Sequence, residues 1–366
     1  GLIAAIIMLC VYIGWTGSLL VSLGFILHTI TGMSANTAII IGTMIVFIYT
    51  MAGGMWAVSL TDFFQMIIVM TGLVIITPIV ISKVGGFAFF VSSLPEDSFR
   101  MTPKDAGTIE WLNYVRAWMV IGLGNIAGQD LLQRSLSAKS EKVAQNSAYL
   151  STIIYLSFGI LPVLIGMAGS ILLPGLDNPE LVVPKLAIEY LSPTLAVFFI
   201  SALLAAVMSS ADSSILACSS VLGKNLLPFT GKTFSDKKIL KWTRLSVPVF
   251  AIFSMFVALY IGEVYTLLLD SFSILLVGLF IPLTAGIWWP KANTPAALSA
   301  MISGSAAWIV FKFITPEIPS DMIGLAFSFL AMVLVTMLTK DKTPANPLQD
   351  ADGVTILYRD RLGILK

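Results

Sequence analysis

Long apolar runs separated by short polar stretches make up most of this chain. A run of about 20 mostly apolar residues is the length that an α-helix needs to cross the hydrocarbon core of a bilayer. Ten such runs lie at 2–30, 36–56, 60–82, 112–132, 147–173, 194–222, 240–261, 264–289, 295–314 and 321–339. The polar stretches 85–111 and 174–192 indicate loops, each with a short surface helix. The pattern predicts an all-α polytopic membrane protein with about ten transmembrane helices.

The composition supports this prediction. Of the 366 residues, 57% are hydrophobic and 11% are charged, against roughly 25% charged residues in a soluble domain. These values exclude a disordered chain and a disulfide scaffold, and they argue against a soluble enzyme. The net charge of +1 gives no basic excess for nucleic acid, and a single histidine excludes a histidine-ligated metal centre. Cys10 and Cys218 lie in apolar runs, so we expect buried thiols.

The basic residues assign the sides of the membrane. Fifteen of the 21 Lys and Arg residues lie in the connections after even-numbered spans or in the tail, and six lie on the other side. By the positive-inside rule the richer side is cytoplasmic. We therefore expect an integral protein of the cell (inner) membrane with its C-terminal tail, 341–366, in the cytoplasm. Gly1 opens directly into an apolar run without a charged flank, which indicates a fragment that lacks its N-terminal part.

The sixth span carries polar residues in the middle of its apolar run. Helical periodicity places Ser209, Ser210 and Ser213 on one face together with Ala206, and Asp212 lies at the border of this face. Serines alone would be typical of close helix packing. A carboxylate at this depth is unfavourable by roughly 2.5–3.5 kcal/mol and marks functional sites. Hydroxyl, carbonyl and carboxylate oxygens together suit a cation such as Na⁺.

Asp62 lies about one turn inside the third span, after a Gly53-Gly54 pair that predicts a sharp turn. Two interpretations stay open from the residues alone. Asp62, or its neighbour Thr61, can cap the N-terminus of the helix by accepting backbone N–H groups. Alternatively, the carboxylate is a cation ligand.

The fourth span is rich in glycine and polar side chains where a lipid-facing helix would be apolar: Gly122, Gly124, Asn125, Gly128, Gln129 and Asp130. A phosphate loop is excluded because no Lys-Ser/Thr follows and no strand precedes. A helix-dimerisation face would not need the amides and the acid. The pattern favours an unwound or kinked helix whose freed backbone groups line a cavity. Trp15, in the first span, is either a packing residue or an aromatic that binds a quaternary ammonium.

Two long motifs resemble a known family. Residues 53–65 are similar to the Gly-Gly…Ala-Val…Thr-Asp…Gln stretch of the sodium/solute symporter family. Residues 205–216 resemble the sodium-site helix of that family, closest in motif to its high-affinity choline transporter branch. Gln133-Arg134, after the glycine-rich segment, fits as well. The resemblance covers essentially the whole chain.

The resemblance implies a LeuT-like inverted-repeat core that lacks its first helices. The transporter domain would be 1–340, with 1–84 ending the first repeat, 112–290 forming the second, and 295–339 adding two helices. It implies a main sodium ion held by the Ala206 carbonyl and the Ser209 and Ser210 hydroxyls. Ser209, Ser213 and Asp62 resemble a second cation site, and Asp212 belongs to the same stripe.

The solute contacts implied are Trp15, Gly124, Asn125, Gly128 and Gln129. The choline branch has a tryptophan where this chain has Gly128, whereas Trp15 matches an aromatic of that branch. A choline-like solute, an amino acid such as proline and a small organic acid therefore all remain open.

The predicted function is sodium-coupled symport of a small organic solute by alternating access, with Na⁺ as the coupling ion and no enzymatic activity. The alternatives are a transporter-like membrane sensor module, a proton-coupled transporter and an ion channel. A channel is disfavoured because no filter sequence repeats and the carboxylates are scattered over several spans. The sequence predicts no oligomeric state.

Overall fold

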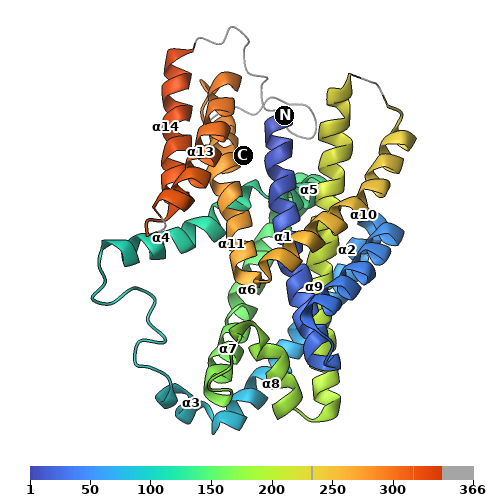
Figure 1. Cartoon of the computed structure of the whole chain (residues 1–366), viewed down its shortest axis with the longest axis vertical. Helices are drawn as coiled ribbons and strands as arrows, with labels where there is room; N and C mark the ends of the chain where they lie inside the picture. Colours follow the sequence, from blue (N-terminus) through green and yellow to red (C-terminus); the bar gives the residue numbers. More distant parts are fainter. Residues whose placement is uncertain (232–233, 316, 340–366) are drawn as a thin grey trace. The chain divides into compact units, whose positions relative to one another are not determined.

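The computed structural model describes residues 1–231, 234–315 and 317–339, apart from the side chains of 52–57. Every regular element in these ranges is helical (Figure 1), which confirms the all-α prediction. Eight helices are long and apolar enough to cross a membrane: Leu2–Thr31, Val58–Val84, Glu141–Leu172, Pro193–Thr230, Asp236–Ile261, Val264–Trp288, Thr294–Ile314 and Ser320–Leu338. The tail 341–366 lies outside the described residues.

Two of the ten predicted spans differ from this pattern. The fourth is broken into α4 (Thr108–Gly122), a 3₁₀ turn η1 (Gly124–Ala127) and α5 (Gln129–Leu136). The second appears as a shorter apolar segment, Ala35–Met51, at the start of α2 (Ala35–Val84). The count of full-length spans in the described part is therefore eight, and the two remaining apolar runs are short or interrupted.

Helix α2 is continuous through the predicted Gly53-Gly54 turn, so the prediction of a sharp turn there is wrong. No proline precedes Pro78 in this helix, and glycine is tolerated within a helix at about 1 kcal/mol. Its 50 residues give a length of about 75 Å at 1.5 Å per residue. Ser34 is the N-cap and accepts the Thr37 amide at 3.2 Å, so Asp62 lies well inside the helix and is not its cap.

The short surface helices are present as predicted. They are α3 (Phe87–Ser93) in the first loop, and η2 (Pro179–Leu181) with α8 (Val182–Tyr190) in the second. The thiol prediction is half confirmed, because Cys218 is buried but Cys10 is exposed on α1 (Leu2–Thr31). An exposed thiol on an apolar helix is compatible with a lipid-facing position, where hydropathy alone does not separate core from surface.

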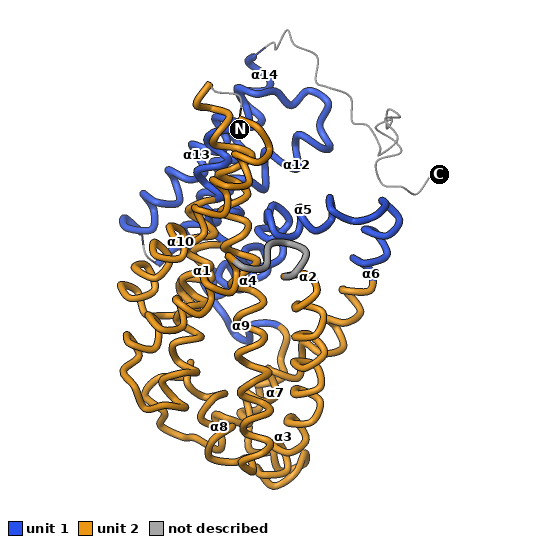
Figure 2. The backbone as a smooth tube through the Cα atoms, turned by 90° about the vertical axis from the view of Figure 1, so that its right-hand side faces the viewer, with its two compact units in different colours: residues 1–8, 102–149, 272–366 blue, residues 9–101, 150–271 orange. Residues whose placement is uncertain are grey.

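The chain divides into two compact units, coloured separately in Figure 2. Unit 1 contains 1–8, 102–149 and 272–366, and unit 2 contains 9–101 and 150–271. In unit 2, α9 (Pro193–Val221) packs along α2, α8 and α10 (Asp236–Ile261), and α7 (Ile160–Leu172) packs on α2 and α8.

Helix α9 contributes to two apolar clusters at different heights. Near its start, Phe199 packs in a cluster with Ile76 and Ile165. Further along, Ile215 packs in a second cluster with Ile39 and Val247. The α9 backbone is thereby fixed on both sides of its polar stretch, which holds the polar side chains in place.

In unit 1, α13 (Thr294–Ile314) and α14 (Ser320–Leu338) lie side by side (Figure 1) and both pack on a π-helical turn, η5 (Leu276–Phe280). Small residues allow this approach. A Cβ atom at Gly324 would lie 2.8 Å from the Gly304 carbonyl oxygen and 2.9 Å from Val277 Cγ1. Close helix contact through small residues is the usual packing mode in membranes, where no hydrophobic force joins helices.

We expect Gly324→Ala to lower the stability of unit 1 by about 1–3 kcal/mol, because the added methyl forces two backbones apart. The matched control is Gly286→Ala in α12 (Ile281–Trp288), where a Cβ would meet open space. The measurement is the Tm of the purified protein in detergent. An equal Tm for the two variants would contradict the packing argument.

Candidate functional site

Asp62 and Ser209 meet across α2 and α9 although 147 positions separate them in the chain. The Ser209 hydroxyl donates a hydrogen bond of 2.5 Å to Asp62 Oδ1. Both side chains are partly buried. The structure therefore joins the two predicted cation ligands that come from different motifs.

The other predicted ligands of the sixth span lie on α9 itself. Ala206, Ser210 and Ser213 follow the same helical face as Ser209, and all three are half-buried. Asp212 lies at the border of this face and is 0% exposed. Ser209 thus brings a hydroxyl oxygen of α9 to the carboxylate of α2, and such oxygens are donors that small hard cations prefer.

Gln65 was not among the predicted ligands. It follows Asp62 by three residues in α2, so the two side chains lie on the same face one turn apart. Its Oε1 is buried and has no hydrogen-bond partner within the described residues. The spacing from Asp62 was the signal available in the sequence. Gln65 Oε1 adds a neutral oxygen acceptor near the Asp62 carboxylate.

On its other side, α9 is held by a buried hydroxyl pair. Thr16 Oγ1 of α1 and Ser214 Oγ lie 2.8 Å apart, and the Ser214 hydroxyl donates to the Ala211 carbonyl at 2.8 Å. These hydroxyls satisfy one another, as buried polar groups must in an apolar core. Ser214 therefore has a packing role, in contrast to the stripe that faces Asp62.

The glycine-rich segment of unit 1 is unwound, as predicted. Helix α4 ends at Gly122, the chain makes the turn η1, and Gly128 is extended at φ −65°, ψ 128° before α5 begins at Gln129. A Cβ atom at Gly124 would lie 2.7 Å from the Phe272 carbonyl oxygen. Gly124 therefore lets the backbone of η1 pack directly on α11 (Val264–Leu275).

Gly128 is crowded by polar atoms. Its amide donates to the Asn125 carbonyl at 2.9 Å. A Cβ atom there would lie 2.9 Å from Asp130 Oδ1 and 3.0 Å from the Asn125 carbonyl oxygen. A tryptophan at this position would require the segment to rearrange. That Asn125, Gly128 and Gln129 line a solute cavity stays a prediction.

Trp15 lies on α1 of unit 2 and is half-buried. Its ring contacts Tyr12 with centroids 5.6 Å apart and an interplanar angle of 52°. Such tilted aromatic pairs add to packing stability. The role of Trp15 as a solute contact stays a prediction.

The comparison with known proteins identifies the family of this chain. Residues 1–304 match the sequence profile of the sodium:solute symporter family. The chain belongs to this family.

Several curated relatives of this symporter-family chain are transporters. The human high affinity choline transporter 1 is 29% identical over 306 residues, which cover 79% of this chain and 52% of the relative. The sodium/pantothenate symporter of Haemophilus influenzae is 28% identical, with coverages of 82% and 66%. The sodium/proline symporter of Staphylococcus aureus is 27% identical, with coverages of 98% and 73%. The chain thus spans about half the length of the choline transporters that it matches.

A solved structure supports the fold. The substrate-bound outward-open state of a Na⁺-coupled sialic acid symporter superposes with a TM-score of 0.74 at 21% identity, over 95% of this chain and 75% of that chain. This likeness confirms the LeuT-like all-α fold class.

We expect Gly124→Ala to destabilise the unwound segment by about 1–3 kcal/mol, because the new methyl overlaps the Phe272 carbonyl. Gly122→Ala, two residues earlier, is the matched control, since a Cβ there meets nothing within 4 Å. Thermal unfolding of the two purified variants gives the comparison. A Tm loss confined to Gly122→Ala would show that the close contact at Gly124 is not required.

Proposed function

We propose that the full-length protein carries out sodium-coupled symport of a small organic solute by alternating access. The observation that carries this proposal is the 2.5 Å contact of Ser209 with Asp62, in a chain of the sodium:solute symporter family. Relatives named as choline, pantothenate and proline transporters support a small organic solute.

The proposed main sodium site uses the Ala206 carbonyl and the Ser209 and Ser210 hydroxyls. All three residues lie on one face of α9. The proposed second cation site uses Asp62, Ser209 and Ser213, with Asp212 beside it. In the structure, the Ser209 hydroxyl donates a hydrogen bond to the Asp62 carboxylate. When Na⁺ binds, the hydroxyl turns its lone pairs to the ion and the carboxylate balances the charge.

Coupling of sodium binding to the conformational change follows because the proposed ion ligands belong to two helices, α2 and α9. An ion bound by α2 and α9 together stabilises the conformation in which these helices are close. The ion shifts the transport equilibrium only by its difference in affinity between the two states. Ion binding at residues of two helices provides such a difference, because separating the helices removes part of the ligand set.

The proposed solute contacts are the unwound segment and Trp15. Unwound backbone groups in a broken helix bind polar solutes because their hydrogen bonds are not used within the helix. The contributing residues are Gly124, Asn125, Gly128 and Gln129. Crowding at Gly128 argues against an aromatic there. A choline-like solute, an amino acid such as proline and a small organic acid are the classes to test.

We also propose the placement of the chain in its membrane. Residues 1–84 would end a first repeat, 112–290 would form the second, and 295–339 would add two helices. The excess of Lys and Arg on one set of connections supports a cytoplasmic C-terminus in the cell (inner) membrane.

The first test is uptake into proteoliposomes that contain the full-length protein. Labelled choline, proline and pantothenate are each offered with an inward Na⁺ gradient, with an inward proton gradient, and with neither. We expect Na⁺ to stimulate uptake of one of these solutes. Uptake driven only by protons would replace sodium as the coupling ion. Absence of any gradient-driven uptake, together with a Tm that does not respond to Na⁺, would overturn the proposal.

The second test addresses the ion ligands. We expect Asp62→Asn and Ser210→Ala each to raise the sodium concentration for half-maximal uptake about tenfold, which corresponds to about 1.4 kcal/mol of lost ion binding. Ser201→Ala is the matched control, because this serine lies on the exposed side of the same helix and donates to the Val197 carbonyl. Unchanged sodium activation in both ligand variants would contradict the site assignment.

A further inference from the structure

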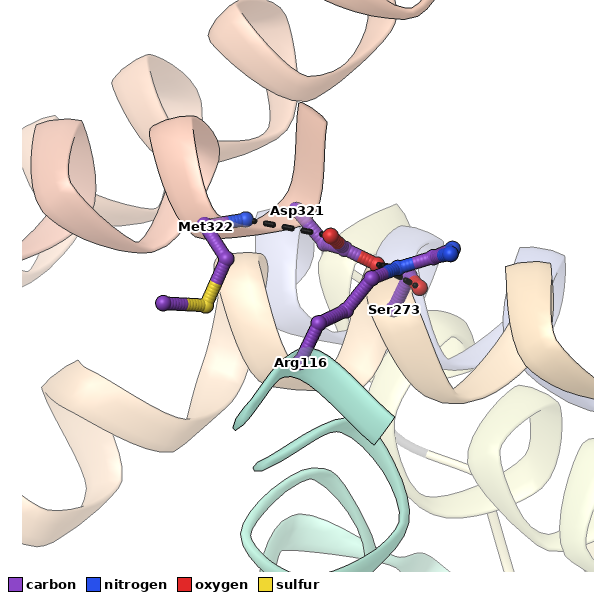
Figure 3. A network of polar contacts seen from close by, with 4 residues as sticks. All are labelled: Arg116, Ser273, Asp321 and Met322. Atoms are coloured by element: carbon purple, nitrogen blue, oxygen red, sulfur yellow. Dashed lines mark hydrogen bonds and ion pairs between the residues drawn. The ribbon is translucent and has the colours of Figure 1, made fainter. Parts of the chain in front are cut away.

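Asp321 is a fully buried carboxylate in the first turn of α14, with an exposed fraction of 0%. Arg116 Nε donates to its Oδ2 at 2.6 Å, and the Ser273 hydroxyl donates to the same oxygen at 2.9 Å (Figure 3). The Met322 amide donates to Oδ1 at 3.1 Å. Three segments of unit 1, α4, α11 and α14, therefore meet at one side chain.

The charges of this network depend on each other. A carboxylate in an apolar interior is stable only with a partner charge and hydrogen bonds. Asp321 has both, and it also lies at the positive end of the α14 dipole. Removing Arg116 alone would leave a buried negative charge without its partner, whereas removing both charges would not.

Helix α4 has few other attachments. Val120 is the one buried side chain among its 15 residues. Arg116 is 30% exposed, and it uses Nε alone to bind Asp321. The ion pair ties α4 directly to α14.

The Arg116–Asp321 ion pair lies close in sequence and in structure to the unwound segment. Arg116 and Val120 lie four residues apart on one face of α4, and Gly124 continues this stretch just beyond the helix end at Gly122. At one end of this face, Arg116 binds Asp321, which also binds Ser273. At the other end, Gly124 packs on the carbonyl of Phe272, the residue next to Ser273. Two adjacent residues of α11, Phe272 and Ser273, thus contact Gly124 of η1 and Asp321, the partner of Arg116.

We propose that Arg116 and Asp321 are positioning residues for the solute site. They hold α4 against α11 and α14, and through α4 they fix the backbone of 124–128. This inference rests on the proposed function, because it assigns the unwound segment to the solute. Neither side chain needs to touch the solute.

The test uses the full-length protein with Arg116→Gln, Asp321→Asn and the double variant. We expect each single variant to raise the KM of the transported solute about tenfold, with a smaller effect on maximal uptake, because a buried charge loses its partner. The double variant should have a Tm closer to wild type than either single variant, since it leaves no unpaired charge. Its KM should stay raised, because the ion pair that ties α4 to α14 is missing. The half-saturating sodium concentration should change less than twofold, because the Asp62–Ser209 pair is intact.

A second readout needs no solute. Asn125→Cys, in a background without other reactive cysteines, reports the position of the unwound segment through its rate of labelling by a maleimide. We expect Arg116→Gln and Asp321→Asn to change this rate several-fold. The matched control is Arg100→Gln, which removes an exposed ion pair with Asp97 of 3.7 Å. Such surface pairs contribute little, so the labelling rate should be that of wild type.

The outcomes separate the two proposals. A lower Tm with wild-type KM and wild-type labelling would show that the network only stabilises the fold, and it would overturn the positioning role. If the single variants do not fold, the double variant decides, since a wild-type labelling rate in it would also overturn that role. Absence of sodium-driven uptake in the wild type would contradict the proposed function. The labelling comparison would then still test whether Arg116 and Asp321 position the unwound segment.

Discussion

Hydrogen bonding of the backbone in an apolar surrounding is the constraint on which this structure depends. Within hydrocarbon each N–H and C=O group must find its partner inside the protein, so long apolar runs form helices. A helix is interrupted only where protein covers the freed groups. The break at Gly124–Ala127 fulfils this condition, because the turn packs on the backbone of α11 at Phe272. The glycine-rich interruption of the fourth span therefore has a defined, packed structure.

Within each unit, carboxylates in the apolar interior likewise receive hydrogen bonds from neighbouring helices. In unit 2, the Asp62 carboxylate is met by the Ser209 hydroxyl from another helix. In unit 1, the Asp321 carboxylate is met by Arg116 and Ser273. The two contacts differ in charge: Asp321 binds the cationic side chain of Arg116, whereas the Ser209 hydroxyl that meets Asp62 is neutral.

Much of the architecture was predictable from the sequence. Apolar run lengths predicted the helices from α9 to α14 within a few residues, because span length is set by bilayer thickness. Glycine spacing predicted the break in the fourth span, since three glycines in seven residues weaken a helix. The prediction of a turn at Gly53-Gly54 was wrong. Glycine permits a bend without requiring one, and α2 continues through this pair.

The sequence by itself determined the helical class, the family motifs and the oxygen-rich face of α9, because these follow from local periodicity and residue chemistry. The family resemblance grouped Asp62 with Ser209, and the tertiary structure showed their contact, whereas the pairing of Arg116 with Asp321 came from the tertiary structure alone. The pairing of Asp62 with Ser209 and that of Arg116 with Asp321 span 147 and 205 positions. Hydropathy treats a charged residue as a local penalty and carries no information about its partner. Contact across helices depends on how whole faces pack, which no local pattern specifies.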